Sequence, residues 1–312
     1  GSNVDGGIAA YREGGHDGVI AFGGGSALDA AKTVALMVAQ DRPLWDFEDV
    51  GDNWTRVNVD GLAPVVAVPT TSGTGSEVGR SSVITNEEIK VKKIIFHPTM
   101  VPAVVISDPE LTVGLPPHIT AATGIDAFVH CFEALCATAY HPMADGIALE
   151  GMRLIAEALP RAYADGADIE ARADMLTAAS MGATAFQKGL GGVHALAHPI
   201  GAHFNVHHGL ANAIFLPYVM AANREAIADK SVPLMRLLDL PSTGFSALMD
   251  WVLEFREALG IPHTLTEIDL GDEHAEDMGA LAHADPVAGG NPIPLSVADY
   301  TAIFRNAVNG TI

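Results

Sequence analysis

Hydrophobic residues form three short continuous runs in the first part of the chain, over residues 18–22, 64–69 and 103–108. Polar or glycine-rich sequence follows each run. Continuous apolar strands separated by helical segments indicate a parallel sheet that is covered on both faces. The first run leads into Gly23-Gly24-Gly25 and then into a helical segment, Ala27 to Gln40, for which Ser26 is placed as the N-cap.

Residues 82–96 alternate between apolar and polar positions and predict an antiparallel excursion. From about Pro116 onward, apolar residues recur every three or four positions, which is typical of amphipathic helices. The predicted helices are 119–137, 143–164, 169–187, 194–204 and 210–226. We expect Pro160 to kink the second of these helices or to end it early. The acidic, Gly/Pro-rich segment 269–294 predicts surface loop and short helix.

This change of pattern places a domain junction in the Leu111–Pro117 stretch. The sequence therefore predicts an α/β domain with a parallel sheet over residues 1–113 and an all-α domain over residues 114–312. A chain of 312 residues that is 49% hydrophobic can bury the cores of two such domains.

The charge of the chain excludes some partners. Seventeen basic and thirty-eight acidic residues give a net charge of -21, which disfavours nucleic acid and anionic membranes as partners. The two cysteines, Cys131 and Cys136, form neither a disulfide framework nor a zinc-ribbon spacing. No apolar run approaches the length of a membrane span. We therefore expect a cytoplasmic protein.

Two loops are candidates for binding phosphate. Gly23–Ser26 lies between a predicted strand and a helix, where free N–H groups can face an anion, although a simple tight turn explains the glycines equally well. It is not a Rossmann fingerprint, because Leu28 takes the third glycine position, and Lys32 lies too far away for a P-loop. The second loop, residues 70–77, carries five hydroxyl groups after a buried strand. Together the loops favour a nucleotide site.

Carboxylate and imidazole side chains form a second candidate site. Asp126 and His130 are spaced i and i+4 on a predicted helix, as are His194 and His198, and His208 follows after one more helical segment. Each pair alone has an ordinary structural explanation, but so many imidazoles in apolar sequence suggest a divalent ion. The ligand types do not choose among iron, zinc, manganese, cobalt and nickel. The absence of a tetrathiolate favours a catalytic site.

At these residues the chain closely resembles the iron-containing (group III) alcohol dehydrogenases. The matching segments are GGGSALDAAK at 23–32, PTTSGTGSEVG at 69–79, ISDPELTVGLPP at 106–117, GIDAFVHCFEA at 124–134 and HALAHPIGAHFNVHHGLANAIFLPYVM at 194–220. The resemblance implies a dinucleotide-binding α/β domain, a helical metal-binding domain and a cleft between them. It implies four metal ligands: Asp126, His130, His194 and His208. His198 matches a family histidine beside the substrate, whereas His203 and His207 have no assigned role.

The resemblance also implies the reaction. We expect NAD or NADP and one divalent metal, Fe2+ first and Zn2+ next. The hypothesis is reversible hydride transfer between a small alcohol or aldehyde and nicotinamide, with the alcohol oxygen bound to the metal and His198 relaying the proton. We expect a homodimer. The expected cofactor-binding residues are Gly23, Gly24, Gly25, Ser26, Asp29, Thr70, Thr71, Ser72 and Thr74.

Three alternatives remain open at this stage. A metal- and NAD-dependent lyase of the dehydroquinate-synthase kind needs a basic pocket, and residues 194–218 contain no Lys or Arg. A metal hydrolase and a non-catalytic relative are the other two. Family members carry several dozen residues before the segment that resembles Asn3–Phe22, so we expect a preceding segment, which would contain the residues that choose between NAD and NADP.

Overall fold

The three apolar runs form one parallel sheet in the computed structural model, which describes residues 1–312. Its strands are β1 (Val19–Gly23), β2 (Val65–Pro69) and β5 (Val104–Val105), in the order β1-β2-β5. Gly23 pairs with Pro69, so the loops that follow β1 and β2 leave the sheet side by side. The third run is a shorter strand than predicted. Pro69, at the end of β2, has no N–H with which to continue the ladder.

One face of the sheet is covered by helices. α2 (Gly25–Met37) packs against β1 and β2, and α1 (Ser2–Gly14) packs against α2. On the opposite face Ile20 and Phe22 are 73% and 59% exposed, whereas Ala21 between them is fully buried. The expectation of a sheet covered on both faces is therefore wrong, because both N-terminal helices lie on the same side.

The predicted N-cap of α2 is also wrong. The helix begins at Gly25, two residues earlier than expected, and Gly24 is the N-cap. The extended backbone of Gly24 lets its carbonyl oxygen accept hydrogen bonds from the N–H groups of Ala27 and Leu28. Ser26 therefore lies inside the first turn, and its side chain forms no capping hydrogen bond. The helix ends at Met37 instead of Gln40.

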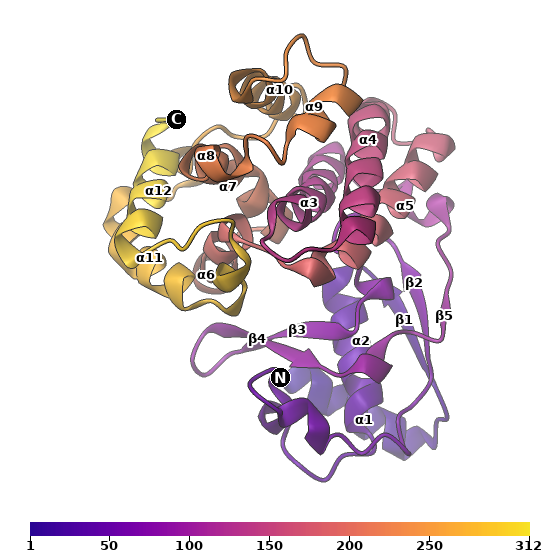
Figure 1. Ribbon diagram of the computed structural model, residues 1–312. Helices are drawn as coiled ribbons and strands as arrows, with labels where there is room; N and C mark the ends of the chain where they lie inside the picture. The colour runs from indigo at the N-terminus through magenta and orange to yellow at the C-terminus, as the bar shows by residue number, and fades with distance from the viewer.

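The antiparallel excursion is confirmed as a hairpin of β3 (Ser81–Asn86) and β4 (Val91–Phe96). Lys90, in the turn, has a positive φ of 53°. β3 contacts α2, while β4 reaches α6 (Gly192–Phe204) of the helical part. The hairpin thus lies between the sheet region and the helices above it (Figure 1).

The rest of the chain is helical, as predicted, and forms the upper part of Figure 1. α3 (Pro117–Cys136) is long and apolar enough to cross a membrane by length and composition, but 94% of that apolar window is buried inside the protein. It is therefore the central core helix. The other helices are α4 (Pro142–Ala164), α5 (Ile169–Ala185), α6, α7 (His208–Ala222), α8 (Arg224–Ile227), α9 (Val232–Leu237), α10 (Phe245–Ala258), α11 (Ala275–Ala284) and α12 (Val297–Asn309).

Two features of this helical part bear on the sequence predictions. α4 continues through Pro160 to Ala164, so Pro160 does not end it. Pro160 is exposed, and water can bind the carbonyl group that loses its intrahelical donor there. The segment 269–294 is loop and short helix as predicted, but α11 within it packs against α6 and α12 and buries Met278.

Candidate active site

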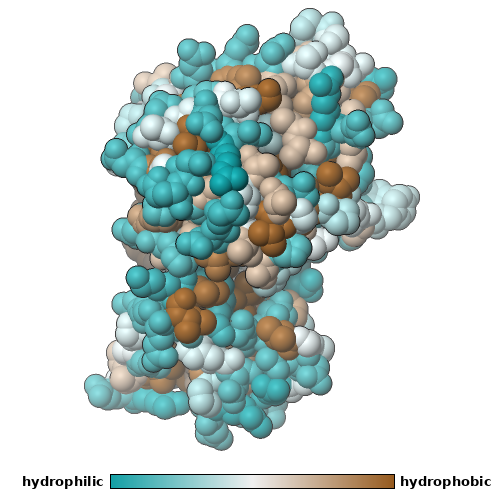
Figure 2. All heavy atoms as spheres, turned by 90° about the vertical axis from the view of Figure 1, so that its left-hand side faces the viewer, coloured by the Kyte–Doolittle hydropathy of each residue, from teal (hydrophilic) through white to brown (hydrophobic).

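A cavity of about 250 Å³ lies between the hairpin, the two strand-end loops and the helical domain. We call it the active-site cavity. Figure 2 shows the molecule narrowing at the level where the two parts meet, with hydrophobic side chains visible at this waist. The cavity is lined by Gly25, Ser26, Asp29, Thr74, Ser76, Gly79, Ser81, Val83, Thr85, Lys92, Ile94, His130, Phe186, Leu190, His194, His198, His208 and Val287.

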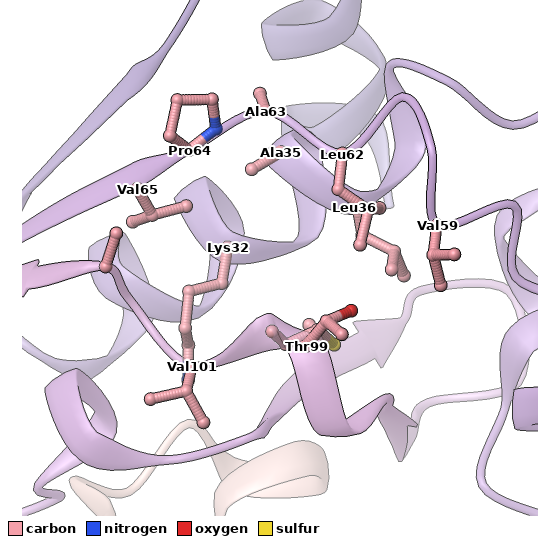
Figure 3. A pocket seen from close by; sticks show the side chains of 12 residues that line it. Lys32, Ala35, Leu36, Val59, Leu62, Ala63, Pro64, Val65, Thr99 and Val101 are labelled. Atoms are coloured by element: carbon pink, nitrogen blue, oxygen red, sulfur yellow. The ribbon is translucent and has the colours of Figure 1, made fainter.

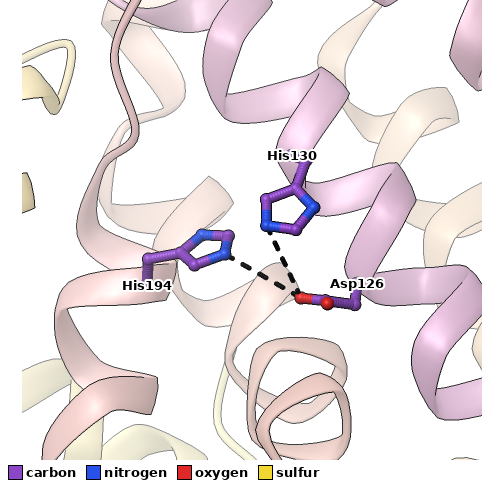
Figure 4. A group of neighbouring side chains, drawn as sticks. All are labelled: Asp126, His130 and His194. Atoms are coloured by element: carbon purple, nitrogen blue, oxygen red, sulfur yellow. Dashed lines mark ion pairs between the residues drawn. The ribbon is translucent and has the colours of Figure 1, made fainter. Parts of the chain in front are cut away.

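The four predicted metal ligands meet at the helical side of this cavity. Asp126 and His130 project from one face of α3, His194 from the first turn of α6, and His208 from the start of α7. Asp126, His130 and His194 are buried, and their ligand atoms all lie within 4.8 Å of one another. Figure 4 shows both imidazole rings turned toward the Asp126 carboxylate.

The spacing of these atoms suits a divalent cation. Oδ1 of Asp126 lies 3.9 Å from Nε2 of His130, 3.8 Å from Nε2 of His194 and 3.7 Å from Nε2 of His208. Ligands about 2.1 Å from a tetrahedral ion lie about 3.4 Å apart. Asp126, His130 and His194 therefore fit such an ion after adjustment, and His208 Nε2 lies at a similar distance from the Asp126 carboxylate.

Asn212 completes the surroundings of this cluster. Its amide Nδ2 donates to Oδ1 of Asp126 at 2.6 Å and lies 3.1 Å from Nε2 of His194 and 3.2 Å from Nε2 of His208. Asn212 Oδ1 is buried without a hydrogen-bond partner. The Asn212 amide group therefore contacts three of the four predicted ligands and fixes the Asp126 carboxylate.

Glu133 orients one of the imidazoles. Its Oε2 lies 2.7 Å from Nδ1 of His194, and its Oε1 accepts a hydrogen bond from the Val193 N–H at 2.7 Å. Burial raises the pKa of Glu133 to about 7, against the opposing effect of the backbone donors at residues 193 and 191. When the carboxylate is ionised, the His194 proton lies on Nδ1, which leaves Nε2 free to face Asp126.

Two imidazoles of the cluster, those of His194 and His208, are held neutral. Burial, reinforced by neighbouring His130, keeps the pKa of His194 well below its ordinary value. Burial, reinforced by Lys92, does the same for the pKa of His208. Because a neutral imidazole is the form that binds metal, this environment favours ligation over protonation.

His198 lies one turn beyond His194 and lines the active-site cavity. Its Nδ1 is 2.9 Å from Oδ2 of Asp285, which approaches from the loop after α11. Its ring stacks on that of His208, with centroids 5.5 Å apart. A carboxylate therefore fixes the orientation of His198 and leaves Nε2 for a proton on the cavity side.

The two predicted phosphate loops pack directly against each other at the opposite wall. A Cβ added at Gly25 would overlap the Thr74 side chain, so glycine allows this approach. Gly75 has a positive φ of 61° and lies against Ala179 and Ala183 of α5. The glycine loop, the hydroxyl loop and the helical domain are thus in contact.

Only some of the predicted cofactor-binding residues line the active-site cavity. Gly25, Ser26, Asp29 and Thr74 line the active-site cavity, whereas the structure does not bring Gly23, Gly24, Thr70, Thr71 and Ser72 to its wall. Asp29 is occupied by protein donors, since Oδ1 accepts from Ser76 Oγ at 2.5 Å and Oδ2 from the Val83 N–H at 2.8 Å. Its carboxylate thus ties α2 to the hydroxyl loop and the hairpin.

A second cavity of about 250 Å³, between α2 and the start of β2, is mostly apolar, and none of the predicted site residues line it (Figure 3). Lys32 lies at its wall, but its ammonium group donates to the carbonyl oxygens of Ser76, Gly79 and Ser81. Lys32 therefore fixes the end of the hydroxyl loop to the start of the hairpin.

Sequence reasoning missed four residues at the candidate site: Lys92, Glu133, Asn212 and Asp285. Two of them had a usable signal, since Glu133 lies three residues after His130 and Asn212 four residues after His208, each on the same helix face. Asp285 and Lys92 come from segments distant in sequence. No local pattern connects them to the histidines.

Comparison with known proteins identifies the family of this chain. The model of the family described as "Iron-containing alcohol dehydrogenase" matches residues 1–109, and that of the "Fe-containing alcohol dehydrogenase family, C-terminal" matches residues 120–308. The 4-hydroxybutyrate dehydrogenase of Cupriavidus necator is 38% identical over 96% of this chain and 80% of its own length. The NAD-dependent methanol dehydrogenase of Bacillus methanolicus is 34% identical over 98% of this chain and 81% of its own.

Solved structures give the same result. The crystal structure of a 1,3-propanediol oxidoreductase superposes with a TM-score of 0.93 at 34% identity, covering 98% of this chain and 81% of the other. A sulfoacetaldehyde reductase from Bifidobacterium kashiwanohense, in complex with NAD+, superposes with a TM-score of 0.87 at 28% identity, covering 97% of this chain and 79% of the other. By sequence and by structure, the chain belongs to the iron-containing alcohol dehydrogenase family of oxidoreductases.

Proposed function

We propose that this protein is an NAD(P)-dependent alcohol dehydrogenase that transfers a hydride reversibly between a small alcohol or aldehyde and nicotinamide. The observation that carries the proposal is the position of the Asp126 cluster, on one wall of a cavity whose other wall is formed by Gly25, Ser26 and Thr74. A dinucleotide on the loops would bring its reactive end toward the cluster. Family membership favours this oxidoreductase over the lyase and hydrolase alternatives.

Asp126, His130, His194 and His208 would bind one divalent metal, Fe2+ first and Zn2+ next. When bound, such an ion supplies Lewis acidity toward an alcohol or carbonyl oxygen. Glu133 fixes the tautomer of His194, and Asn212 fixes the Asp126 carboxylate by its hydrogen bond. Asp126, His130 and His194 are buried, and this environment of low polarity would strengthen the electrostatic stabilisation of negative charge on that oxygen.

His198 would accept the alcohol proton at Nε2, because Asp285 holds its Nδ1 and the ring lines the cavity. Gly25, Ser26 and Thr74 would bind the phosphate groups and the nicotinamide half of NAD or NADP. Gly23 and Gly24 would join them at the pyrophosphate, and Thr70, Thr71 and Ser72 would lie toward the nicotinamide half. Asp29 would hold the loops together through Ser76 and Val83.

Three further assignments complete the proposal. The domain division falls between residues 113 and 114, with a dinucleotide-binding domain before it and a helical metal domain after it. The protein works as a homodimer on small molecules. It works in the cytoplasm, where the free, buried thiols of Cys131 and Cys136 stay reduced.

Elemental analysis of anaerobically purified protein, together with Asp126→Ala, tests the proposal. We expect about one iron or zinc per chain in the wild type, as a single site of this donor set requires, and loss of both metal and alcohol-dependent NAD(P) reduction in the variant. A folded wild-type protein that contains no metal, and that gains no activity from added Fe2+ or Zn2+, would overturn it.

A further inference from the structure

Asn291 and Asn223 form a buried amide pair between the loop after α11 and the end of α7. Nδ2 of Asn223 donates to Oδ1 of Asn291 at 2.9 Å, and Nδ2 of Asn291 donates to Oδ1 of Asn223 at 2.8 Å. Nδ2 of Asn291 also donates to the carbonyl oxygen of Ile293 at 2.8 Å. The Asn291 and Asn223 side chains are 5% and 4% exposed. A buried amide pair with these hydrogen bonds made holds one geometry.

The oxygen of Asn291 also reaches the start of α6. It accepts a hydrogen bond at 3.0 Å from the N–H of Gly192, the first residue of that helix. The first N–H groups of a helix have no partner within it, and the N-cap residue here, Gly191, has no side chain that could accept one. Asn291 therefore supplies, from a distant part of the sequence, the acceptor that an N-cap residue usually provides.

Glu133 of α3 supplies the next acceptor, so the first turn of α6 is held by two side chains. Its Oε1 accepts from the Val193 N–H. A Cβ added at Gly191 would lie 3.0 Å from Oδ1 of Asn291 and 3.2 Å from Oε1 of Glu133, so glycine at this position lets both acceptors approach. His194, a predicted metal ligand, is the next residue along the helix. The position of this ligand thus depends on both contacts.

The loop after α11 contacts α6 at a second place. Asp285, which follows the last residue of α11, has its Oδ2 2.9 Å from Nδ1 of His198. Asn291 lies at the other end of the loop and binds Gly192. The loop is therefore bound to α6 at both of its ends, and Asn291 makes the contact that lies nearer in sequence to His194.

We propose that Asn291 is a positioning residue of the metal site, which fixes the first turn of α6 and thereby the place of His194 relative to Asp126. Asn291 forms no hydrogen bond with a predicted ligand and does not line the active-site cavity, so it acts through the backbone at Gly192. Without this contact the first turn can shift, and Nε2 of His194 would leave its position 3.8 Å from Oδ1 of Asp126. This inference rests on the proposed function, in which His194 is a ligand.

The experiment compares Co2+ binding by the wild type, Asn291→Ala and Gln40→Ala. Co2+ is the probe because its visible absorption reports the number and geometry of its ligands. Gln40 is the matched control, since its amide is also buried and binds the backbone of Leu36 and Asn58, just after the end of α2. Both substitutions leave buried backbone groups unpaired, so both should lower the stability of the metal-free protein in urea.

Only Asn291→Ala should change the metal site. Its affinity for Co2+ should fall about tenfold, at the lower end of the range for residues that support a ligating histidine. The absorption spectrum of its saturated Co2+ complex should also differ from that of the wild type. Gln40→Ala should keep both the affinity and the spectrum. Asn223→Ala, which leaves the contact with Gly192 in place and removes only the amide partner of Asn291, should give a smaller loss of affinity.

Wild-type affinity and spectrum in Asn291→Ala, together with lowered stability, would overturn the inference and leave Asn291 a structural role alone. An equal loss of affinity in Gln40→Ala would also overturn it, because destabilisation in general would then explain the effect. If Asn291→Ala does not fold, Asn223→Ala decides, and an unchanged affinity and spectrum there would count against Asn291. A folded wild type that binds neither Co2+ nor Zn2+ would contradict the proposed function itself, and the positioning role with it.

Discussion

Glu133 and His194 form a buried pair between α3 and α6, with Oε2 of the glutamate 2.7 Å from Nδ1 of the imidazole. The side chains are 6% and 1% exposed, so water does not compete for this contact. The pair joins the helix that carries Asp126 and His130 to the helix that carries His194 and His198. It therefore sets both the tautomer of one candidate ligand and the spacing of two helices at the site.

Glu133→Gln should weaken metal binding about 10- to 100-fold, the range found when a partner of a ligating histidine is removed. Oε1 of Glu133 accepts from Val193 and Oε2 faces His194. A glutamine has only one acceptor oxygen, so its amide N–H groups would have to face either the Val193 N–H or the N–H of His194, both of which are donors. Competition with a chelator, followed by elemental analysis, measures the change.

Glu150→Gln is a suitable control for this variant, because Glu150 lies on the surface of α4 and pairs only with Arg153. Its metal affinity should equal that of the wild type. Unchanged affinity in Glu133→Gln, with the circular dichroism spectrum of the wild type, would show that Glu133 does not orient the ligand.

The residues of the metal cluster could be predicted because local periodicity places them. Asp126 and His130 share a helix face at i and i+4, and His208 begins a helix that follows α6 directly. The partners that orient them could not be predicted in the same way. Asp285 reaches His198 across 87 positions of sequence, and only the packing of α11 against α6 brings the two together.

Lys92 is a second residue whose place at the site could not be predicted from the sequence. Residues 194–218 contain no Lys or Arg, which argued against recognition of an anion. The structure brings Lys92 into the cavity from the hairpin, whose strands the sequence predicted without their position. Alternation along a strand gives its two faces but does not say which face meets a distant helix. The same limit applies to β1, where the apolar run predicts that Ile20 and Phe22 are buried although both side chains are exposed.

Gly25→Ala should weaken NAD(P)+ binding at least tenfold while the protein remains folded. The new methyl group would overlap the Thr74 side chain and separate the two loops that line the cavity. A displacement of the backbone N–H groups at a helix start reduces their contact with phosphate. Fluorescence titration with NAD+ and with NADP+ measures the loss.

Gly146→Ala provides the comparison, since this glycine of α4 has no atom within 4 Å of an added Cβ. That variant should bind the dinucleotide as the wild type does and gain about 0.5–1 kcal/mol of stability, because alanine favours the helix. If Gly25→Ala binds the dinucleotide as tightly as the wild type, the phosphates do not bind at the glycine loop.

Because its imidazole is buried, His97 should make the folded protein less stable as the pH becomes more acidic. The imidazole is 6% exposed, and its Nδ1 accepts a hydrogen bond from the Thr99 N–H at 3.2 Å. Burial lowers the pKa of His97 below its ordinary value of 6.5. Below pH 6.5 the unfolded chain therefore binds a proton that the folded protein excludes, so the free energy of unfolding falls as the pH falls.

His97→Asn removes this titration and keeps a side-chain acceptor for Thr99, because asparagine is a good N-cap residue. Between pH 6.5 and 5.5 the unfolding free energy of the wild type should fall faster than that of the variant, by no more than about 1.4 kcal/mol per pH unit. Urea unfolding at several pH values measures both slopes. Parallel curves would show that His97 does not couple protonation to folding.

His198→Gln should keep the metal but lower kcat about 100-fold or more, because a positioned acid–base group contributes about 10²–10⁴ to the rate. None of the ligand contacts of the Asp126 cluster depends on His198, whose Nδ1 is bound to Asp285 and whose ring only stacks on His208. Glutamine preserves a hydrogen bond to Asp285 but cannot accept and release a proton near neutral pH. Metal content and steady-state kinetics on the same preparation separate the two effects. Asp285→Asn should give a smaller loss with a displaced pH profile, because the imidazole remains while its partner no longer carries charge. Full turnover in His198→Gln at normal metal content would remove His198 from the proton path and leave solvent in the cavity to take the proton.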